Sequence, residues 1–225
     1  MYIKLLLIFS FFLLPIAVYA HGVSTNDATF MVANSGPAII QYMYLGAKHM
    51  ITGYDHILFL IGVVFFLYHM KDIALYVSLF TIGHSTTLLI GVLGGITVNS
   101  FLIDAIIGLS VVYKGFDNLG GFKKVFGFQP STKKAVGIFG LFHGFGLAAK
   151  LQDYTFSEEG LITNIISFNV GVEIGQILAL ILVLVGFSYL RIDPKFQKKS
   201  YIINGILMLL GFILIGFQLT GYFLS

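Results

Sequence analysis

The stretch His49-Met-Ile-Thr-Gly-Tyr-Asp55-His56 leads directly into an apolar run, residues 57–67 (ILFLIGVVFFL), and this juxtaposition decides the fold. Two imidazoles and a carboxylate stand at the mouth of a segment with the composition of a membrane-spanning helix. A charged side chain at the centre of such a helix costs about 2.5–3.5 kcal/mol on insertion scales. Because the chain has only 10 acidic residues and 6 histidines among 225, three of them together indicate a functional site.

The overall composition is that of an integral membrane protein. Charged residues make up 10% of the chain and hydrophobic ones 57%, whereas soluble domains carry about 25% charged residues. The 26 glycines allow close helix packing in lipid, and the four-apart pairs 140/144 and 171/175 are predicted to be packing contacts. The absence of cysteine excludes disulfides and thiolate ligands, so a metal would have to be held by imidazole, carboxylate, amide or backbone oxygen. The net charge of +3 gives no nucleic-acid signal, and membrane lipid is the expected surrounding.

Residues 1–20 have the pattern of a cleaved secretory signal peptide, with Lys4, an apolar run and Val18-Tyr19-Ala20 at the cleavage site. The alternative is an uncleaved first span. Cleavage would leave His21 as the mature N-terminus, which would either chelate a metal or remain a solvated polar end. Residues 22–35 are expected to be extended or loose, and residues 37–48 an interfacial helix.

The rest of the chain, residues 21–225, is predicted to form a single all-α transmembrane domain. It would be a polytopic bundle of six helices, with spans near 54–70, 73–95, 100–118, 134–151, 161–190 and 200–223. Lysines and Arg191 gather in alternate loops, whereas Asp153, Glu158 and Glu159 share one loop on the opposite side. By the positive-inside rule, both mature termini lie outside a bacterial-type inner membrane.

His49 and His56 are the first candidate metal ligands. Seven positions on one straight helix return to nearly the same face but about 10 Å along the axis, too far apart to share one ion. Either the helix breaks near Gly53 and folds His49 back, or the two histidines act in sequence. Asp55 has two interpretations as well: it belongs to a capping box with Thr52, or it ligates a cation or orients a histidine.

Further polar groups occur one by one in the later apolar runs. His84 and His143 lie within spans, where each is either a metal ligand or a histidine bonded to a backbone carbonyl. Asn169, Glu173 and Gln176 are spaced i, i+4, i+7 and are predicted to form one stripe that points into the bundle, with Glu173 as a buried anionic ligand or proton carrier. Asp104 is expected near the outer face as a supporting group. Lys114 and Asp117 are interpreted as a pair with each other.

Imidazole and carboxylate together suit Ni, Zn, Co, Fe or Cu(II), and affinity order does not choose among them. There is no HExxH motif, nucleophile elbow or phosphate loop, so hydrolase or ATPase chemistry of the soluble type has no support. The expected metal residues are therefore His49, Asp55, His56, His84, His143 and Glu173, with Asp104, Asn169 and Gln176 supporting them.

Several of these motifs resemble those of the HupE/UreJ membrane proteins. His49 followed by Asp55-His56 is similar to the first signature of that family, and Phe142-His143-Gly144 is similar to the start of its second. The runs FTIGHS (80–85) and FNVGVEIGQ (168–176) resemble its second subgroup in particular. The resemblance implies a nickel permease in which His49, Asp55, His56 and His143 bind metal. The second signature of the nickel-linked branch continues with a His and a Glu, where this chain has Leu147 and Lys150.

Three functions are carried forward from the sequence. The first is a divalent-metal permease with an intramembrane site at His56, His84, His143 and Glu173. The second is an intramembrane metalloenzyme that acts on a lipid or peptide and holds its ion tightly. The third is a non-transporting assembly partner, in which the polar groups only hold helices together. The sequence favours the transporter over the enzyme.

Overall fold

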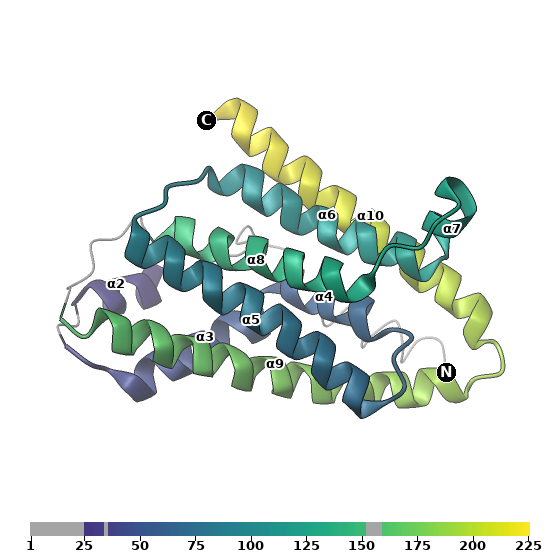
Figure 1. Ribbon diagram of the computed structural model, residues 1–225, viewed down its shortest axis with the longest axis horizontal. Coiled ribbons are helices and arrows are strands. Elements are labelled where there is room, and N and C mark those ends of the chain that lie inside the picture. The colour runs from purple at the N-terminus through teal and green to yellow at the C-terminus, as the bar shows by residue number, and fades with distance from the viewer. Residues whose placement is uncertain (1–24, 34–35, 152–158) are drawn as a thin grey trace.

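The computed structural model describes residues 25–33, 36–151 and 159–225, and every regular element in these ranges is an α-helix. The predicted signal peptide, His21, Asp153 and Glu158 lie outside the described residues. Figure 1 shows the long helices side by side in one bundle. The predicted all-α class is confirmed. The helices are α2 (Thr25–Ala33), α3 (Ile39–Thr52), α4 (Tyr54–Val64), α5 (Met70–Gly94), α6 (Ser100–Asn118), α7 (Gly121–Phe126), α8 (Thr132–Leu151), α9 (Leu161–Ile192) and α10 (Phe196–Leu224).

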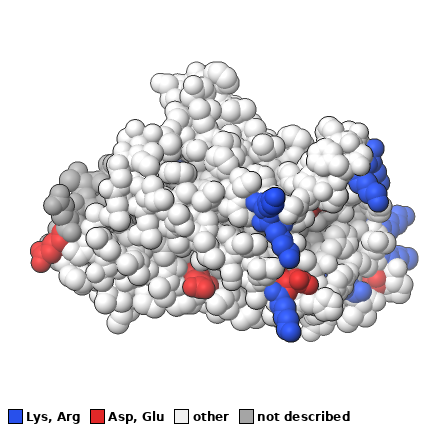
Figure 2. All heavy atoms as spheres, viewed as in Figure 1, with Lys and Arg blue, Asp and Glu red and all other residues white. Residues whose placement is uncertain are grey.

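Three of these helices, α5, α9 and α10, are long and apolar enough to cross a membrane, and α4 is a shorter apolar helix. The predicted segments 73–95, 100–118, 134–151, 161–190 and 200–223 coincide closely with α5, α6, α8, α9 and α10. Figure 2 shows Lys and Arg gathered in the right half of the view, toward one end of the bundle. This distribution agrees with the charge asymmetry of the loops.

The first predicted span differs from the structure. The helix expected over 54–70 ends at Val64, and it is preceded by α3, which packs against α9. Gly53 separates the two helices in an extended conformation (φ −72°, ψ 97°). The far end of α4 is held by Arg191, which donates to the carbonyls of Val64 and Phe65 at 2.7 and 2.9 Å. The expectation of a loose chain is also wrong for residues 25–33, which form α2.

Close contacts at glycine residues allow particular pairs of helices to pack together. The pairs with the most extensive contact are α5 with α8, α3 with α9, and α6 with α10. A Cβ atom on Gly144 would lie 2.1 Å from the His84 carbonyl oxygen, and one on Gly171 would lie 1.9 Å from the Met43 carbonyl oxygen. Small residues permit this approach of one backbone to another. The glycine pairs predicted to be packing contacts, 140/144 and 171/175, therefore do pack helices together.

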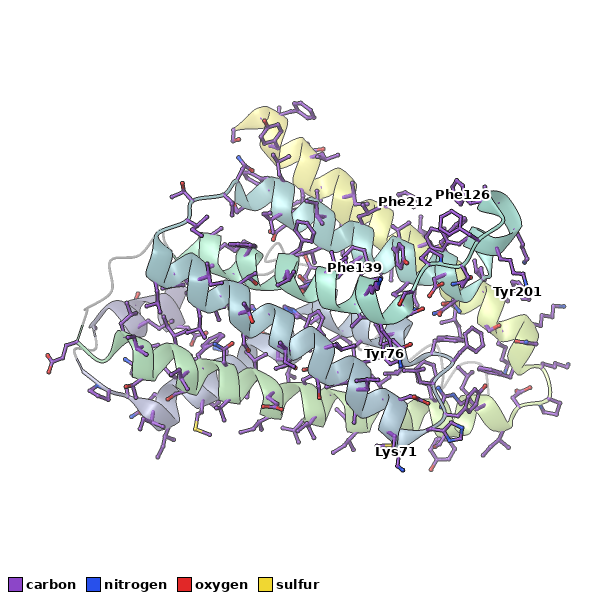
Figure 3. All side chains as sticks on the ribbon, in the orientation of Figure 1. Lys71, Tyr76, Phe126, Phe139, Tyr201 and Phe212 are labelled. Atoms are coloured by element: carbon purple, nitrogen blue, oxygen red, sulfur yellow. The ribbon has the colours of Figure 1, made fainter. Side chains whose placement is uncertain are left out.

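An apolar core lies between α4, α5, α8 and α9, with Val111 of α6 and Leu207 of α10. Tyr76 and Phe139 pack against this core, and Figure 3 shows both within the bundle, whereas Lys71 lies at its margin. The polar groups of the site thus sit between two apolar clusters.

Candidate metal centre

The break at Gly53 brings His49 and His56 together. The centroids of the two rings are 5.1 Å apart, about half the separation that a straight helix would give. The Gly53 N–H donates to the His49 carbonyl at 2.9 Å. A Cβ atom at position 53 would lie 2.7 Å from His56 Nδ1 and 3.1 Å from Asp55 Oδ1, so glycine leaves room for these two side chains. Of the two alternatives for this stretch, the broken helix is the one observed.

His84, from the middle of α5, completes a cluster of three imidazoles. One ring nitrogen from each of His49, His56 and His84 lies within 4.8 Å of the others. The three residues are 6%, 1% and 0% exposed, so the cluster is enclosed by the bundle. Nitrogens bound at about 2.1 Å to one tetrahedral ion would be roughly 3.4 Å apart. Movements on the order of an ångström would therefore let all three bind a single ion.

His143, on α8, stands next to this cluster as a fourth imidazole. Its ring centroid is 5.0 Å from that of His56, and the residue is fully buried. Its Nδ1 lies 2.8 Å from the Phe139 carbonyl oxygen. Because a carbonyl only accepts, Nδ1 carries the proton and the Nε2 atom keeps its lone pair. This is the arrangement by which a backbone carbonyl orients a metal-binding histidine.

Asp55 contacts His56 and does not form the predicted capping box. No side chain caps the start of α4, and the Thr52 hydroxyl donates to the Lys48 carbonyl instead. The buried Asp55 carboxylate places Oδ1 3.2 Å from His56 Nδ1. A carboxylate beside Nδ1 favours the tautomer with its proton there, which leaves Nε2 for an ion. The structure thus places the Asp55 carboxylate beside the His56 ring and not at a helix cap.

Aromatic side chains wall the cluster. The Phe80 ring centroid is 4.9 Å from that of His143, the Phe59 centroid is 5.4 Å from the same ring, and the Phe168 centroid is 5.8 Å from that of His49. Beside His56 a cavity of about 10 Å³ extends toward Tyr76, which is room for about one water molecule. Polar groups in such surroundings act on one another more strongly than in water.

Gln176 belongs to the wall of that cavity. Its side-chain oxygen accepts a hydrogen bond of 2.6 Å from Thr81 Oγ1, and this bond joins α9 to α5. Asn169 is also buried, but its amide donates to the Ile165 carbonyl of its own helix. Asp104 is buried as well and forms an ion pair of 2.6 Å with Lys150. The structure therefore places Gln176 beside the cluster, and Asp104 in a separate contact between α6 and α8.

The prediction that Glu173 points into the bundle is wrong: its side chain is exposed. The buried face of α9 is centred on the ridge that receives α3, which includes Phe168, Val172 and Gly175. At 100° per residue, Glu173 falls roughly 130° away from the centre of that ridge, whereas Gln176 falls roughly 75° away from it. Spacing along one helix could not show this, because the packing of α3 determines which face is buried.

The backbone carbonyl that was one of the two interpretations of His143 is that of Phe139, four residues earlier on the same helix. Thr81 is a group beside the site that the sequence analysis missed, and its pairing with Gln176 across 95 positions has no signal in the sequence. Lys114 and Asp117 form the predicted pair at 2.6 Å.

Comparison with known proteins gives one match. A protein-family model with the description HupE / UreJ protein matches residues 25–225, which include the three histidines of the cluster and His143. No curated protein and no solved structure matches the chain.

Proposed function

This chain belongs to the HupE/UreJ family, and from that premise we propose that it is a permease for a divalent transition metal, with nickel as the type substrate. The ion would pass through the cluster of His49, His56, His84 and His143, with Asp55 orienting His56. The family is associated with the transport of nickel and cobalt, which supports the substrate class.

The observation that carries this proposal is the convergence of imidazoles from different helices on one buried point. Histidines are rarely brought together inside a bundle of membrane helices, and when they are, they mark ion or proton pathways. An all-imidazole site suits Ni, Zn, Co, Fe or Cu(II). With no thiolate ligand in the chain, an ion can be bound and also released, as transport requires.

The membrane arrangement is part of the proposal. The first of six spans consists of α3 and α4 together, broken at Gly53, and the others are α5, α6, α8, α9 and α10. Broken helices are where transporters commonly expose backbone and ligands at mid-membrane depth. Residues 1–20 are a removed signal peptide, residues 21–225 are one transmembrane domain, and both mature ends face the outside of a bacterial-type inner membrane. The lysine-rich end of the bundle is then the inner end.

The test is metal uptake into proteoliposomes, with Ni, Co, Zn, Cu and Fe assayed in parallel. We expect saturable uptake of one of these ions by the native chain and its loss in His56→Ala and His84→Ala. His69→Ala is the matched control, because His69 is an exposed histidine outside the cluster. A purified chain that keeps stoichiometric metal through chelator washing but transports none would indicate the metalloenzyme instead. A chain that neither binds nor transports metal would indicate the assembly partner.

A further inference from the structure

The loop between α6 and α8 carries the short helix α7, at the lysine-rich end of the bundle. Figure 1 shows α7 projecting from that end. The sequence of α7 is GFKKVF, and at 100° per residue Phe122, Val125 and Phe126 share one side of the helix. The other side carries Lys123 and Lys124. This short helix is therefore amphipathic.

Three large apolar side chains of this loop face outward. Val125, Phe126 and Phe128 are 65%, 59% and 59% exposed. The Phe126 ring centroid lies 6.1 Å from that of Phe122, which in turn lies 4.8 Å from that of Tyr113 on α6. Figure 3 shows Phe126 at the same end of the bundle as Tyr201. A group of exposed apolar side chains marks a contact surface, because leaving it in water is unfavourable.

The buried Asp117 carboxylate holds this loop against α6. Lys114 forms an ion pair with it at 2.6 Å. Gln129 and Thr132, from the other end of the loop, donate hydrogen bonds to the same carboxylate. Because Lys114 already neutralises Asp117, this carboxylate does not neutralise the lysines of the loop.

Four exposed lysines accompany the apolar side chains: Lys123, Lys124, Lys133 and Lys134. None of them forms an ion pair with a residue in the described ranges, and positions 118–149 contain no acidic residue. Lys133 and Lys134 lie in the first turn of α8, where the helix dipole disfavours cations. These two lysines therefore do not serve to stabilise their own helix.

The position of α7 selects the kind of partner. Only residues 119–120 join it to α6 and residues 127–131 to α8, so with α6 and α8 as spans it stays at the bilayer surface. There, apolar side chains enter the acyl boundary while ammonium groups remain level with the headgroup phosphates. The positive-inside rule accounts for the lysines, but not for the exposed apolar side chains beside them.

We propose that this surface binds anionic phospholipid headgroups. We call it the α7 patch, and it consists of Val125, Phe126 and Phe128 with Lys123, Lys124, Lys133 and Lys134. Its charge is complementary to a net negative headgroup, because four ammonium groups lie in a segment without acids. The inference rests on the membrane arrangement given above and not on metal transport, so a chain that transports no metal would still have this surface.

The absence of tryptophan makes the α7 patch directly testable, because one introduced indole reports on its own surroundings. Phe126→Trp places the indole on the α7 patch. Phe212→Trp is the matched control, since Phe212 is 55% exposed on the membrane-crossing helix α10. Each full-length variant is reconstituted in phosphatidylcholine vesicles that contain a minor fraction of brominated lipid, either phosphatidylglycerol or phosphatidylcholine. Bromine quenches tryptophan fluorescence on contact.

We expect brominated phosphatidylglycerol to quench Phe126→Trp roughly fivefold more than brominated phosphatidylcholine at the same mole fraction, which is the effect of one lysine at a charged surface. Salt at about 1 M should remove this preference by screening. Phe212→Trp should be quenched equally by the two lipids. A lack of quenching at Phe212→Trp as well would refute the membrane arrangement together with this proposal.

The lysines are tested in the Phe126→Trp background. Replacing all four by glutamine should abolish the preference for phosphatidylglycerol but keep quenching by phosphatidylcholine, whereas replacing them by arginine should keep the preference. Circular dichroism and gel filtration check that both variants are folded. Equal quenching of Phe126→Trp by the two lipids, or a preference that survives the glutamine substitutions, would overturn the proposal. So would a water-like emission spectrum without quenching by either lipid, which would indicate a soluble acidic partner instead.

Discussion

Substituting Gly144 by alanine should open the contact between α5 and α8 and disturb the metal centre. The new Cβ atom would lie 2.1 Å from the His84 carbonyl oxygen and 2.2 Å from the Thr87 hydroxyl, where an ordinary contact is at least 3.4 Å. Neither helix can relieve this by a rotamer change, because the closest atom belongs to the backbone. The two helices must therefore separate by about 1.3 Å at this level, measured against the 3.4 Å contact distance.

The change in stability caused by Gly144→Ala is the sum of two opposing effects. Overpacking of a close contact typically costs about 1–3 kcal/mol, and the separation also strains the hydrogen bond of 2.7 Å from Thr87 to the Leu141 carbonyl. Alanine at an unhindered helical position is worth about 0.5–1 kcal/mol over glycine. Gly137 is such a position on the same helix, since a Cβ there meets nothing within 4 Å. Gly144→Ala should destabilise the protein by about 1–3 kcal/mol, and Gly137→Ala should stabilise it slightly.

The assay combines unfolding of purified protein in detergent with metal binding by calorimetry. Since Gly144 lies next to His143 and against His84, we expect metal affinity to fall roughly 10- to 100-fold, the size of effect produced by disturbing the support of a metal ligand. Gly137→Ala should bind normally. Equal stability and equal affinity in the two variants would refute the claim that this glycine contact positions the histidines.

Three other changes probe the supports of the site and the inner loop. Asp55→Asn should weaken metal binding roughly 10- to 100-fold, because it removes the carboxylate beside His56; titration calorimetry against His69→Asn measures this, and an unchanged affinity would contradict the orienting role. Arg191→Met should lower the free energy of unfolding in denaturant by about 1.5–3 kcal/mol, since two carbonyls at the end of α4 lose a charged donor. A smaller loss of stability in Arg191→Met than in Arg191→Lys would contradict this role of Arg191. The hydrogen bond from the Lys199 side chain, followed by that from the Lys195 backbone, lowers the pKa of Asp193. Its contribution to stability is therefore present above the unfolded-state pKa and lost as pH falls through the folded-state pKa; unfolding below about pH 4 should show this loss in the native chain and not in Asp193→Asn.

Much of the architecture was predictable because it follows from local patterns. Apolar runs of span length predicted five of the helices to within four residues at each end, and four-residue glycine spacing predicted packing contacts. The first span was the exception: the apolar run continues through Phe65 and Phe66, but the helix stops at Val64, where Arg191 from α9 donates to the carbonyls at its end. That contact joins residues 127 positions apart, and no local signal carries it.

The metal centre was likewise predictable in part. The residues at 49, 55, 56, 84 and 143 were recognisable because titratable side chains are costly in a membrane helix and stand out against an apolar background. Glu173 stood out for the same reason, yet it faces away from the bundle. Burial cost identifies unusual residues, but the direction in which each side chain points depends on where neighbouring helices pack.

By itself the sequence determined that this protein is a helical membrane protein of the HupE/UreJ family with histidines inside its helices, because composition, periodicity and short motifs are local properties. The tertiary structure alone decided that the helix breaks at Gly53 so that His49 meets His56, that close glycine contacts set α5 against α8 so that His84 stands near His143, and that Glu173 is left on the outside. Each of these depends on contact between segments distant in the chain. Such contacts are set by the shapes of helix surfaces, which no single helix encodes.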